Sequence, residues 1–501
     1  MSSRSSIKLN LCASWVAHGV TLVIGFFLMP FVLHKLGDRS YGAWIFINSA
    51  ASYAGLMYLG FGHAIQVYVA KHRAEGDWHR LNEKVNVILA VYLGMGTIAF
   101  CLAGLLAGLA PVMHKWDPEM LVEVRLVMLI LGLNIAIGMT GSVFGGVLMG
   151  LQRFDLVSGI AIGADLFRLG LTVLFLRHEW GLVTLASIYL AATVLENLIY
   201  IVLAFRFIPT LSLRRMYVKL AVLKECFGFS LYVFLGHISA QLIYATDTLV
   251  IGFMLGAEAI VPYYIALRLC QFIQRPIQQI GEVCMPKAGE LHAKAASSQL
   301  AGLLVRALGV AFLLTTGMFI GTVYFGNALL LTWVGPGYDE SQRLLLVLLF
   351  AQTIALPLGV LRSILFGMGH VRAPAIMFFA EAVLNLVLSM LLIRPLGVMG
   401  VALGTAIPIA VIEIGLLLPY ALKHLQLNGW KLLWDVLGPQ SMPLLALVAY
   451  SAVVCRCFDV SQGWTKLVVV TAGGGAVLLS TWGVQYLVYR HANLSKAITT
   501  S

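Results

Sequence analysis

A chain of 501 residues with 60% hydrophobic and only 11% charged residues is too apolar for a soluble globular protein, in which about a quarter of the residues are charged. Apolar runs of about 20 residues recur along the chain, and each is long enough to cross a bilayer. Basic residues flanking such runs on the cytoplasmic side account for the net charge of +11, so this charge does not indicate a nucleic-acid partner. No stretch between the runs has room for a soluble catalytic domain, which argues against an enzyme.

The apolar runs predict transmembrane helices in chain order. The first run is too long for the core of a signal peptide, and we interpret it as a retained helix. Fourteen helices are expected, at 9–33, 42–70, 85–110, 122–150, 156–176, 181–204, 228–255, 259–285, 303–334, 343–366, 374–393, 400–421, 441–457 and 466–488.

The first twelve predicted helices form two similar halves. Leu36-Gly37 recurs 219 residues later as Leu255-Gly256, and Glu196 recurs 217 residues later as Glu413. Six helices return the chain to its starting side, so the halves share one orientation, as in transporters built from parallel repeats. We therefore expect an all-α polytopic membrane protein with two six-helix lobes in a parallel pseudo-twofold repeat and an appended C-terminal helix pair. The expected parts are an N-lobe at 1–204, a cytoplasmic linker at 205–227, a C-lobe at 228–424, and the pair with its tail at 425–501.

The distribution of Lys and Arg indicates the orientation in the membrane. With a cytoplasmic N-terminus, nineteen of these residues fall in inside segments and seven in outside segments. Because basic residues favour the cytoplasmic side, both termini are expected to be cytoplasmic.

The predicted helix 259–285 carries a polar stripe, which repeats at about 3.6 residues per turn and so lies on one helix face. Its members are Arg268, Gln271, Arg275, Gln278, Gln279 and Glu282. A central Arg costs about 2.5–3.5 kcal/mol in a membrane, so this face must meet water or polar partners. We favour the wall of a wet cavity, in which the two arginines and three glutamines bind the substrate. The alternative is that buried acids such as Asp247 neutralise the arginines and lock the helix bundle.

Other ionisable groups fall inside predicted helices. His18 and His237 occupy matched positions in the first helix of each half. This makes both residues candidates for substrate binding in one cavity or for proton sensing, and the alternative is that both are packing histidines. Asp165 and Arg168 are three residues apart, and a local ion pair is expected. For the matched Glu196 and Glu413, helix packing is favoured over ion coupling. The candidates for coupling or gating are Asp247, Glu282, Asp165, Arg168, Arg362 and Glu381.

Motifs for nucleotide or metal chemistry are missing from the sequence. It has no Walker loop, no dinucleotide fingerprint and no H-E-x-x-H pair. No cofactor and no metal are therefore expected.

Several short motifs resemble a known family. The stretch Leu36–Trp44 (LGDRSYGAW), followed by Leu59-Gly60 and Ala70–Asp77 (AKHRAEGD), is similar to the polysaccharide-exporter branch of the multidrug/oligosaccharidyl-lipid/polysaccharide superfamily. The stretch Tyr263–Pro286 and the loop Gly367–Pro374 also fit that branch. The resemblance spans roughly residues 9–425.

This resemblance implies a flippase that works by alternating access. Its substrate would be undecaprenyl-pyrophosphate-linked oligosaccharide, a repeat unit of O-antigen (lipopolysaccharide), capsule or exopolysaccharide, carried from the inner to the outer leaflet of the bacterial inner membrane. Arg268 aligns with a cavity arginine of lipid II flippases. The implied partners are the lipid-linked oligosaccharide, membrane lipid, a glycan polymerase and glycosyltransferases. No nucleic-acid partner is expected.

Two other functions remain as alternatives. An ion-coupled drug/cation antiporter of the same superfamily is expected to have an acid in its first helix, where this chain offers His18. A membrane glycan polymerase or ligase is expected to have a large extracytoplasmic loop, which the sequence lacks. The glycan, the coupling ion and the oligomeric state do not follow from the sequence.

Overall fold

The computed structural model describes residues 3–58, 61–113, 116–176, 181–219, 231–458 and 463–499. Within these ranges every regular element is a helix, and eleven helical stretches are long and apolar enough to cross a membrane. The predicted all-α polytopic membrane protein is therefore confirmed. Of the fourteen predicted helices, the first two share one apolar stretch, Trp15–Met57, and those at 228–255 and 259–285 carry several polar side chains and are not among the eleven.

Contacts between residues divide the chain into two compact units. Unit 1 consists of residues 1–241 and 248–261, and unit 2 consists of residues 242–247 and 262–501. The helix α8 (Leu231–Met254) contributes to both units. The division into lobes with a linker at 205–227 stays a prediction.

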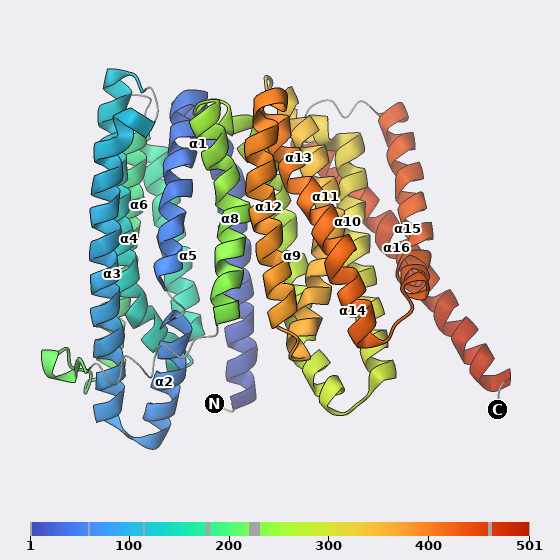
Figure 1. Cartoon of the computed structure of the whole chain (residues 1–501), viewed down its shortest axis with the longest axis horizontal. Coiled ribbons are helices and arrows are strands. Elements are labelled where there is room, and N and C mark those ends of the chain that lie inside the picture. The colour runs from blue at the N-terminus through green and yellow to red at the C-terminus, as the bar shows by residue number, and fades with distance from the viewer. Residues whose placement is uncertain are drawn as a thin grey trace. The chain divides into compact units, whose positions relative to one another are not determined.

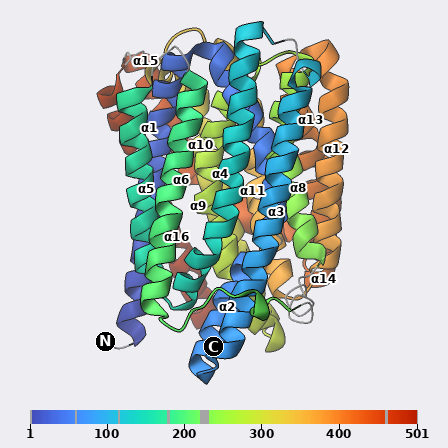
Figure 2. The same ribbon diagram turned by 90° about the vertical axis from the view of Figure 1, so that its left-hand side faces the viewer.

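Unit 1 is a bundle of long helices. They are α1 (Ser3–Ser52), α2 (Phe61–Glu75), α3 (Trp78–Met113), α4 (Pro118–Gly150), α5 (Phe154–Phe175) and α6 (Gly181–Phe207). In this unit α4 packs against α3 and α6, while α5 packs against α1 and α6 (Figures 1 and 2). Pro118 begins α4, at a position where the missing backbone N–H has no helical partner to lose. Buried apolar side chains of α2, α3, α4 and α6 form the core.

Unit 2 contains the remaining helices. They are α9 (Ile260–Ala293), α10 (Ser297–Trp333), α11 (Asp339–Gly367), α12 (Arg372–Leu396), α13 (Val398–Ile409), a π-helical segment (Ala410–Leu417), α14 (Leu418–Leu425), α15 (Gly429–Cys457) and α16 (Trp464–Thr499). The helix α12 packs against α13, and α10 packs against α11 (Figure 1). The helix α15 packs against α10 and α16, and apolar side chains from these three helices form a small separate core.

Matched glycines show the sequence repeat in the backbone. Gly37 and Gly256 both have positive φ, at 74° and 103°, a conformation that glycine adopts without steric cost. Gly150, which ends α4, recurs 217 residues later as Gly367, which ends α11, and both are points of close helix approach. A Cβ atom would lie 2.7 Å from the Cβ of Val69 at Gly150, and 2.0 Å from the carbonyl oxygen of Met285 at Gly367.

Several predicted helix boundaries are wrong. The span 42–70 is interrupted, because α1 ends at Ser52, a 3₁₀ turn follows at Tyr53–Tyr58, and α2 begins at Phe61. The helix predicted at 441–457 begins earlier, at Gly429, where the Asn428 side chain accepts a hydrogen bond from the Lys431 N–H at 3.1 Å and caps the helix. Exposed Trp430 and Trp434 lie in this first part, as is typical of a helix end at the membrane interface.

The described part of the predicted linker is 205–219, of which 205–207 belong to α6. Residues 210–214 are held by two asparagines of α3. Asn82 Nδ2 donates to the Thr210 carbonyl at 3.0 Å, and its Oδ1 accepts from the Ser212 N–H at 2.8 Å. Four residues further along α3, Asn86 makes the same pair of bonds to Ser212 and Arg214, at 2.8 and 3.0 Å. The asparagines therefore hold residues 210–214 against α3. Residues 220–227 of the predicted linker lie outside the described residues.

Candidate functional site

Asp165 and Arg168 form a balanced pair of charges on α5 in unit 1. Asp165 Oδ1 lies 3.0 Å from Arg168 Nη1 on α5, the ion pair that their spacing predicts. The Thr21 hydroxyl on α1 donates to Asp165 Oδ2 at 2.6 Å, and the Arg168 guanidinium lies 4.5 Å from the ring centre of Tyr189 on α6. With one acid and one base, this cluster is electrically neutral and ties three helices together.

The two matched histidines have different surroundings. His18 on α1 is half-buried, and its Nε2 atom is buried without a hydrogen-bond partner. His237 on α8 is exposed. Whether the two line one cavity stays a prediction.

The polar stripe of α9 contains two arginines without an acidic partner in the described part of the chain. Arg268 Nη1 donates to Gln271 Oε1 at 3.1 Å, and its guanidinium lies 5.4 Å from the ring centre of Phe272. Arg275 and Glu282 are exposed. Asp247, the acid that was expected to neutralise the arginines in the alternative interpretation, accepts hydrogen bonds from the Tyr263 and Thr405 hydroxyls. The arginines are therefore available to an anion.

The remaining members of the stripe are glutamines at the edge of a buried network. Gln278 is hydrogen-bonded to the hydroxyl of Tyr244 on α8. Tyr244 also lies close enough to Arg275 for an electrostatic interaction between the two side chains. Gln279 Oε1 is buried without a hydrogen-bond partner. Gln274 is 5% exposed and is not a member of the predicted stripe. It lies six residues after Arg268 and so outside the stripe's helix face, which is why the periodicity does not indicate it.

Arg362 on α11 is the centre of the buried network. It forms a close ion pair with Glu413 of the π-helical segment, and the same Nη2 atom lies 3.9 Å from Glu381 Oε2 on α12. Its guanidinium also lies 4.2 Å from the ring centre of Phe378. Glu381 and Glu413 are 4% and 1% exposed, so two carboxylates share one guanidinium away from water. Glu413 was expected to serve packing, and nothing in the sequence indicated its partner on another helix.

Asp247 on α8 is a second buried acid of unit 2. Its carboxylate accepts hydrogen bonds from the hydroxyls of Tyr263 and Thr405, the latter at 2.8 Å, and more weakly from Ser389 at 3.4 Å. Asn385 Nδ2 donates to the Thr405 hydroxyl at 2.9 Å. No ion pair involving Asp247 occurs among the described residues.

The donor set around Asp247 is made only of oxygen and amide groups, of the kind that hard cations prefer. Sequence reasoning named Asp247 alone, because its neighbours lie up to 158 residues away along the chain. Within the described ranges there is no group of three or more His, Cys, Asp or Glu side chains placed to hold a metal.

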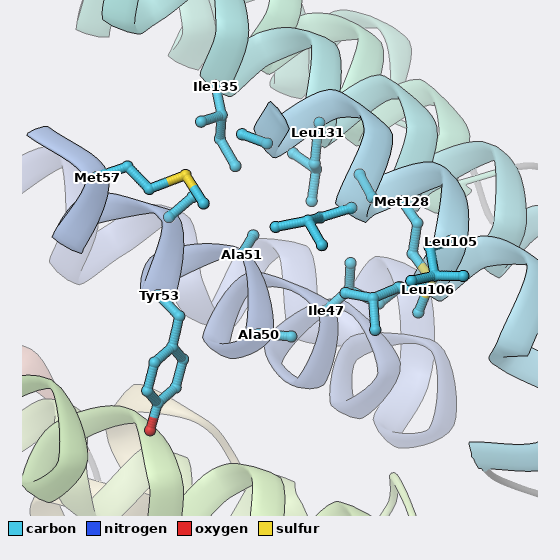
Figure 3. A pocket seen from close by; sticks show the side chains of 15 residues that line it. Ile47, Ala50, Ala51, Tyr53, Met57, Leu105, Leu106, Met128, Leu131 and Ile135 are labelled. Atoms are coloured by element: carbon cyan, nitrogen blue, oxygen red, sulfur yellow. The ribbon is translucent and has the colours of Figure 1, made fainter. Parts of the chain in front are cut away.

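Unit 1 also has an apolar cavity of about 260 Å³ between α1, the 3₁₀ turn, α3 and α4. Its walls are almost entirely aliphatic, and the Tyr53 side chain extends away from Leu106 and Leu131 (Figure 3). Since no charged group lines it, this cavity suits a hydrocarbon chain and not a charged headgroup.

Comparison with known proteins assigns the family. Residues 9–292 match the model of the family described as polysaccharide biosynthesis protein, which is more than half of the chain, so the protein belongs to that family. It is also 20% identical over 267 residues to the uncharacterized membrane protein MJ1068 of Methanocaldococcus jannaschii. The match covers 52% of each chain, so this protein spans about half the length of that curated relative. Leu59-Gly60, one of the family-like motifs, lies outside the described residues.

Solved structures show the same fold. The lipid II flippase MurJ in an inward closed conformation has a TM-score of 0.70 at 14% identity, covering 96% of this chain and 99% of that one. A multidrug resistance MATE family transporter of the MOP superfamily, in its inward-facing conformation, has a TM-score of 0.66 at 17% identity, covering 84% and 98%. A MOP superfamily transporter from Pyrococcus furiosus, described as having a binding pocket of reverse polarity, has a TM-score of 0.58 at 16% identity, covering 84% and 95%. The protein therefore has the fold of MOP superfamily transporters.

Proposed function

We propose that the protein is a flippase for a lipid-linked oligosaccharide whose headgroup carries a pyrophosphate. The family of the chain is polysaccharide biosynthesis, and its fold is shared with a lipid II flippase. A pyrophosphate-sugar headgroup is too polar to cross hydrocarbon unaided, so polysaccharide synthesis needs a protein that carries it. The fold shared with a lipid II flippase therefore supports a transport function for this chain and not a catalytic one.

The single observation that supports this substrate most directly is the pair of unpaired arginines on α9. A guanidinium binds phosphate through two parallel N–H···O bonds, which gives both attraction and orientation. Arg268 and Arg275 are seven residues apart, about 10 Å along the helix axis, so they suit a diphosphate with its attached sugar. Gln271, Gln278 and Gln279 supply neutral donors and acceptors for sugar hydroxyls, and we place His18 and His237 on the same path.

The lipid tail needs a different environment from the headgroup. A polyprenyl chain is apolar and can stay in the bilayer while the headgroup crosses. The aliphatic cavity of unit 1 offers a place for part of such a chain, because it buries hydrocarbon without leaving polar groups unpaired.

The proposed setting is the inner membrane of a bacterium, with both termini cytoplasmic and alternating access between two lobes. In that orientation the substrate enters from the leaflet where its oligosaccharide is assembled by glycosyltransferases. A polymerase on the outer side then uses the product. The acids Asp247, Glu282, Asp165 and Glu381, with Arg168 and Arg362, remain candidates for coupling or gating.

Deletion of the gene in its host tests this proposal. We expect lipid-linked oligosaccharide to accumulate in the inner leaflet and surface polysaccharide to be lost, with recovery by the wild type and partial recovery by Arg268→Lys. Normal surface polysaccharide in the deletion strain, together with increased sensitivity to cationic drugs, would favour the drug antiporter over the flippase.

A further inference from the structure

The buried cluster of Arg362, Glu381 and Glu413 does not balance its charges. When all three side chains are ionised, two carboxylates face one guanidinium and the cluster carries a net charge of −1. A buried carboxylate without its own counter-charge is strongly unfavourable, and two carboxylates close together favour uptake of one proton.

The contacts show which carboxyl lacks a partner. Glu413 forms the close ion pair with Arg362 through Oε1, whereas Glu381 Oε2 lies 3.9 Å from the same nitrogen. The Oε2 atoms of both glutamates are buried without a hydrogen-bond partner, so Glu381 is the carboxyl that lacks a close counter-charge. Glu381 is 96% buried, given its exposure of 4%. Glu381 Oε2 is therefore free to bind a proton.

The other groups that face the cluster do not cancel the excess charge. Tyr244 on α8 interacts electrostatically with Glu381 and Arg362 and is neutral in its ordinary form. Arg275 on α9 acts on Tyr244, but it is exposed and makes no ion pair with either glutamate in the described chain. Phe378 contributes only its ring face to Arg362.

The backbone that presents Glu413 is also unusual. Residues Ala410–Leu417 form a π-helix between α13 and α14, and such segments are rare and occur frequently at functional sites. Unit 1 offers a contrast, because Asp165 there has Arg168 as its own counter-charge and a hydroxyl on its second oxygen.

We propose that Arg362, Glu381 and Glu413 form a proton-binding site, in which Glu381 takes up one proton as a neutral carboxyl, and that exchange of this proton drives flipping. The second part rests on the proposed function. Protonation makes the cluster neutral, so its helices pack against apolar surroundings. Release of the proton restores a buried charge, which gives two states of different stability for one transport cycle.

Infrared spectroscopy tests the site without any transport. The purified full-length protein, containing isotope-labelled glutamate, is placed in lipid vesicles at neutral pH, and the band of protonated glutamate is recorded. We expect such a band in the wild type and its loss in both Glu381→Gln and Glu413→Gln, because one acid then remains for one arginine. Arg362→Gln should enlarge the band about twofold, since two carboxyls then lack a counter-charge. Glu196→Gln, at the matched position of the repeat, is the control and should leave it unchanged.

The outcomes separate the site from its role. Absence of the band in the wild type, or its survival in either glutamate variant, overturns the proton site and leaves the flippase proposal standing. In vesicles with a pH gradient, the wild type should flip its lipid several times faster than without one, and Glu381→Gln should not respond. Flipping by the wild type that ignores the gradient overturns the coupling, whereas absence of flipping contradicts the proposed function and leaves the infrared result intact.

Discussion

Glu196 and Glu413 occupy matched places in the two halves of the repeat, yet the two units use them differently. Glu196 on α6 is half-buried and accepts a hydrogen bond from Tyr200, one turn along its own helix, at 2.9 Å. Glu413 is 1% exposed and pairs with Arg362 from another helix. Glutamate at equivalent positions therefore makes a hydrogen bond within one helix in unit 1 and an ion pair between helices in unit 2.

The acids Asp165 and Glu381 also differ in whether their arginine lies on the same helix or on another one. Asp165 is paired with an arginine on its own helix, so its charge is balanced wherever α5 moves. Glu381 depends on an arginine of α11 that Glu413 already engages. The acid of unit 1 therefore has an arginine of its own, whereas the two acids of unit 2 share one.

The largest expected effect comes from removing the shared arginine. Arg362→Gln leaves Glu381 and Glu413 buried without a counter-charge, so both carboxyls are held neutral by protons, and it should destabilise the protein by about 3–5 kcal/mol. Arg168→Gln leaves one carboxylate, still bonded to Thr21 and partly exposed, and should cost less. Unfolding of both variants in detergent gives the comparison, and equal losses would mean that the two clusters are equivalent.

The arginines of α9 sharpen the comparison between paired and unpaired charges. Loss of a charge-assisted hydrogen bond to phosphate costs about 1.5–3 kcal/mol, so Arg268→Ala and Arg275→Ala should each lower flipping by roughly ten- to a hundredfold while unfolding stays unchanged. Arg268→Lys keeps the charge and should retain part of the activity. A loss of stability in the alanine variants, with activity per folded molecule preserved, would show that the arginines serve the bundle.

The matched glutamates test the contrast directly. Glu413→Gln removes the close partner of Arg362 and should destabilise the protein by about 1–3 kcal/mol, whereas Glu196→Gln keeps an acceptor for Tyr200 and should cost under about 1 kcal/mol. Thermal unfolding of the two variants side by side measures the difference. Equal shifts would remove the distinction that we draw between the units.

The smallest expected effect concerns His370, in the connection between α11 and α12. Burial, with the neighbouring His424 and His292, lowers the pKa of His370 below its ordinary value of 6.5. The unfolded chain therefore binds more protons than the folded one as the pH falls through and below about 6.5, so stability is lost on acidification and regained as the pH rises. In His370→Gln the fall in unfolding temperature between neutral and mildly acidic pH should be smaller than in the wild type, and an identical fall would contradict this role.

Sequence reasoning succeeded where the signal is periodic or local. The helix class and most helix positions follow from apolar runs, the α9 stripe follows from its helical spacing, and the Asp165–Arg168 pair follows from a separation of three residues. The repeat of Leu36-Gly37 as Leu255-Gly256 is accompanied by positive φ at both glycines.

It failed where contacts join distant parts of the chain. The pairing of Arg362 with Glu413 bridges 51 residues, and the π-helical backbone that presents Glu413 has no sequence signal that we recognised. The docking of the linker on Asn82 and Asn86 joins residues about 130 positions apart. Such contacts depend on how helices pack, which composition and periodicity do not specify.

The most direct test of the central claim is a flipping measurement with purified protein. Vesicles containing the protein and a polyprenyl-pyrophosphate-linked oligosaccharide are assayed for the oligosaccharide exposed on each side, with Arg268→Ala and Arg268→Lys in parallel vesicles. We predict movement of the oligosaccharide across the bilayer by the wild type, partial movement by Arg268→Lys and little by Arg268→Ala. Vesicles in which the folded wild-type protein moves no more lipid-linked oligosaccharide than empty vesicles would contradict the account.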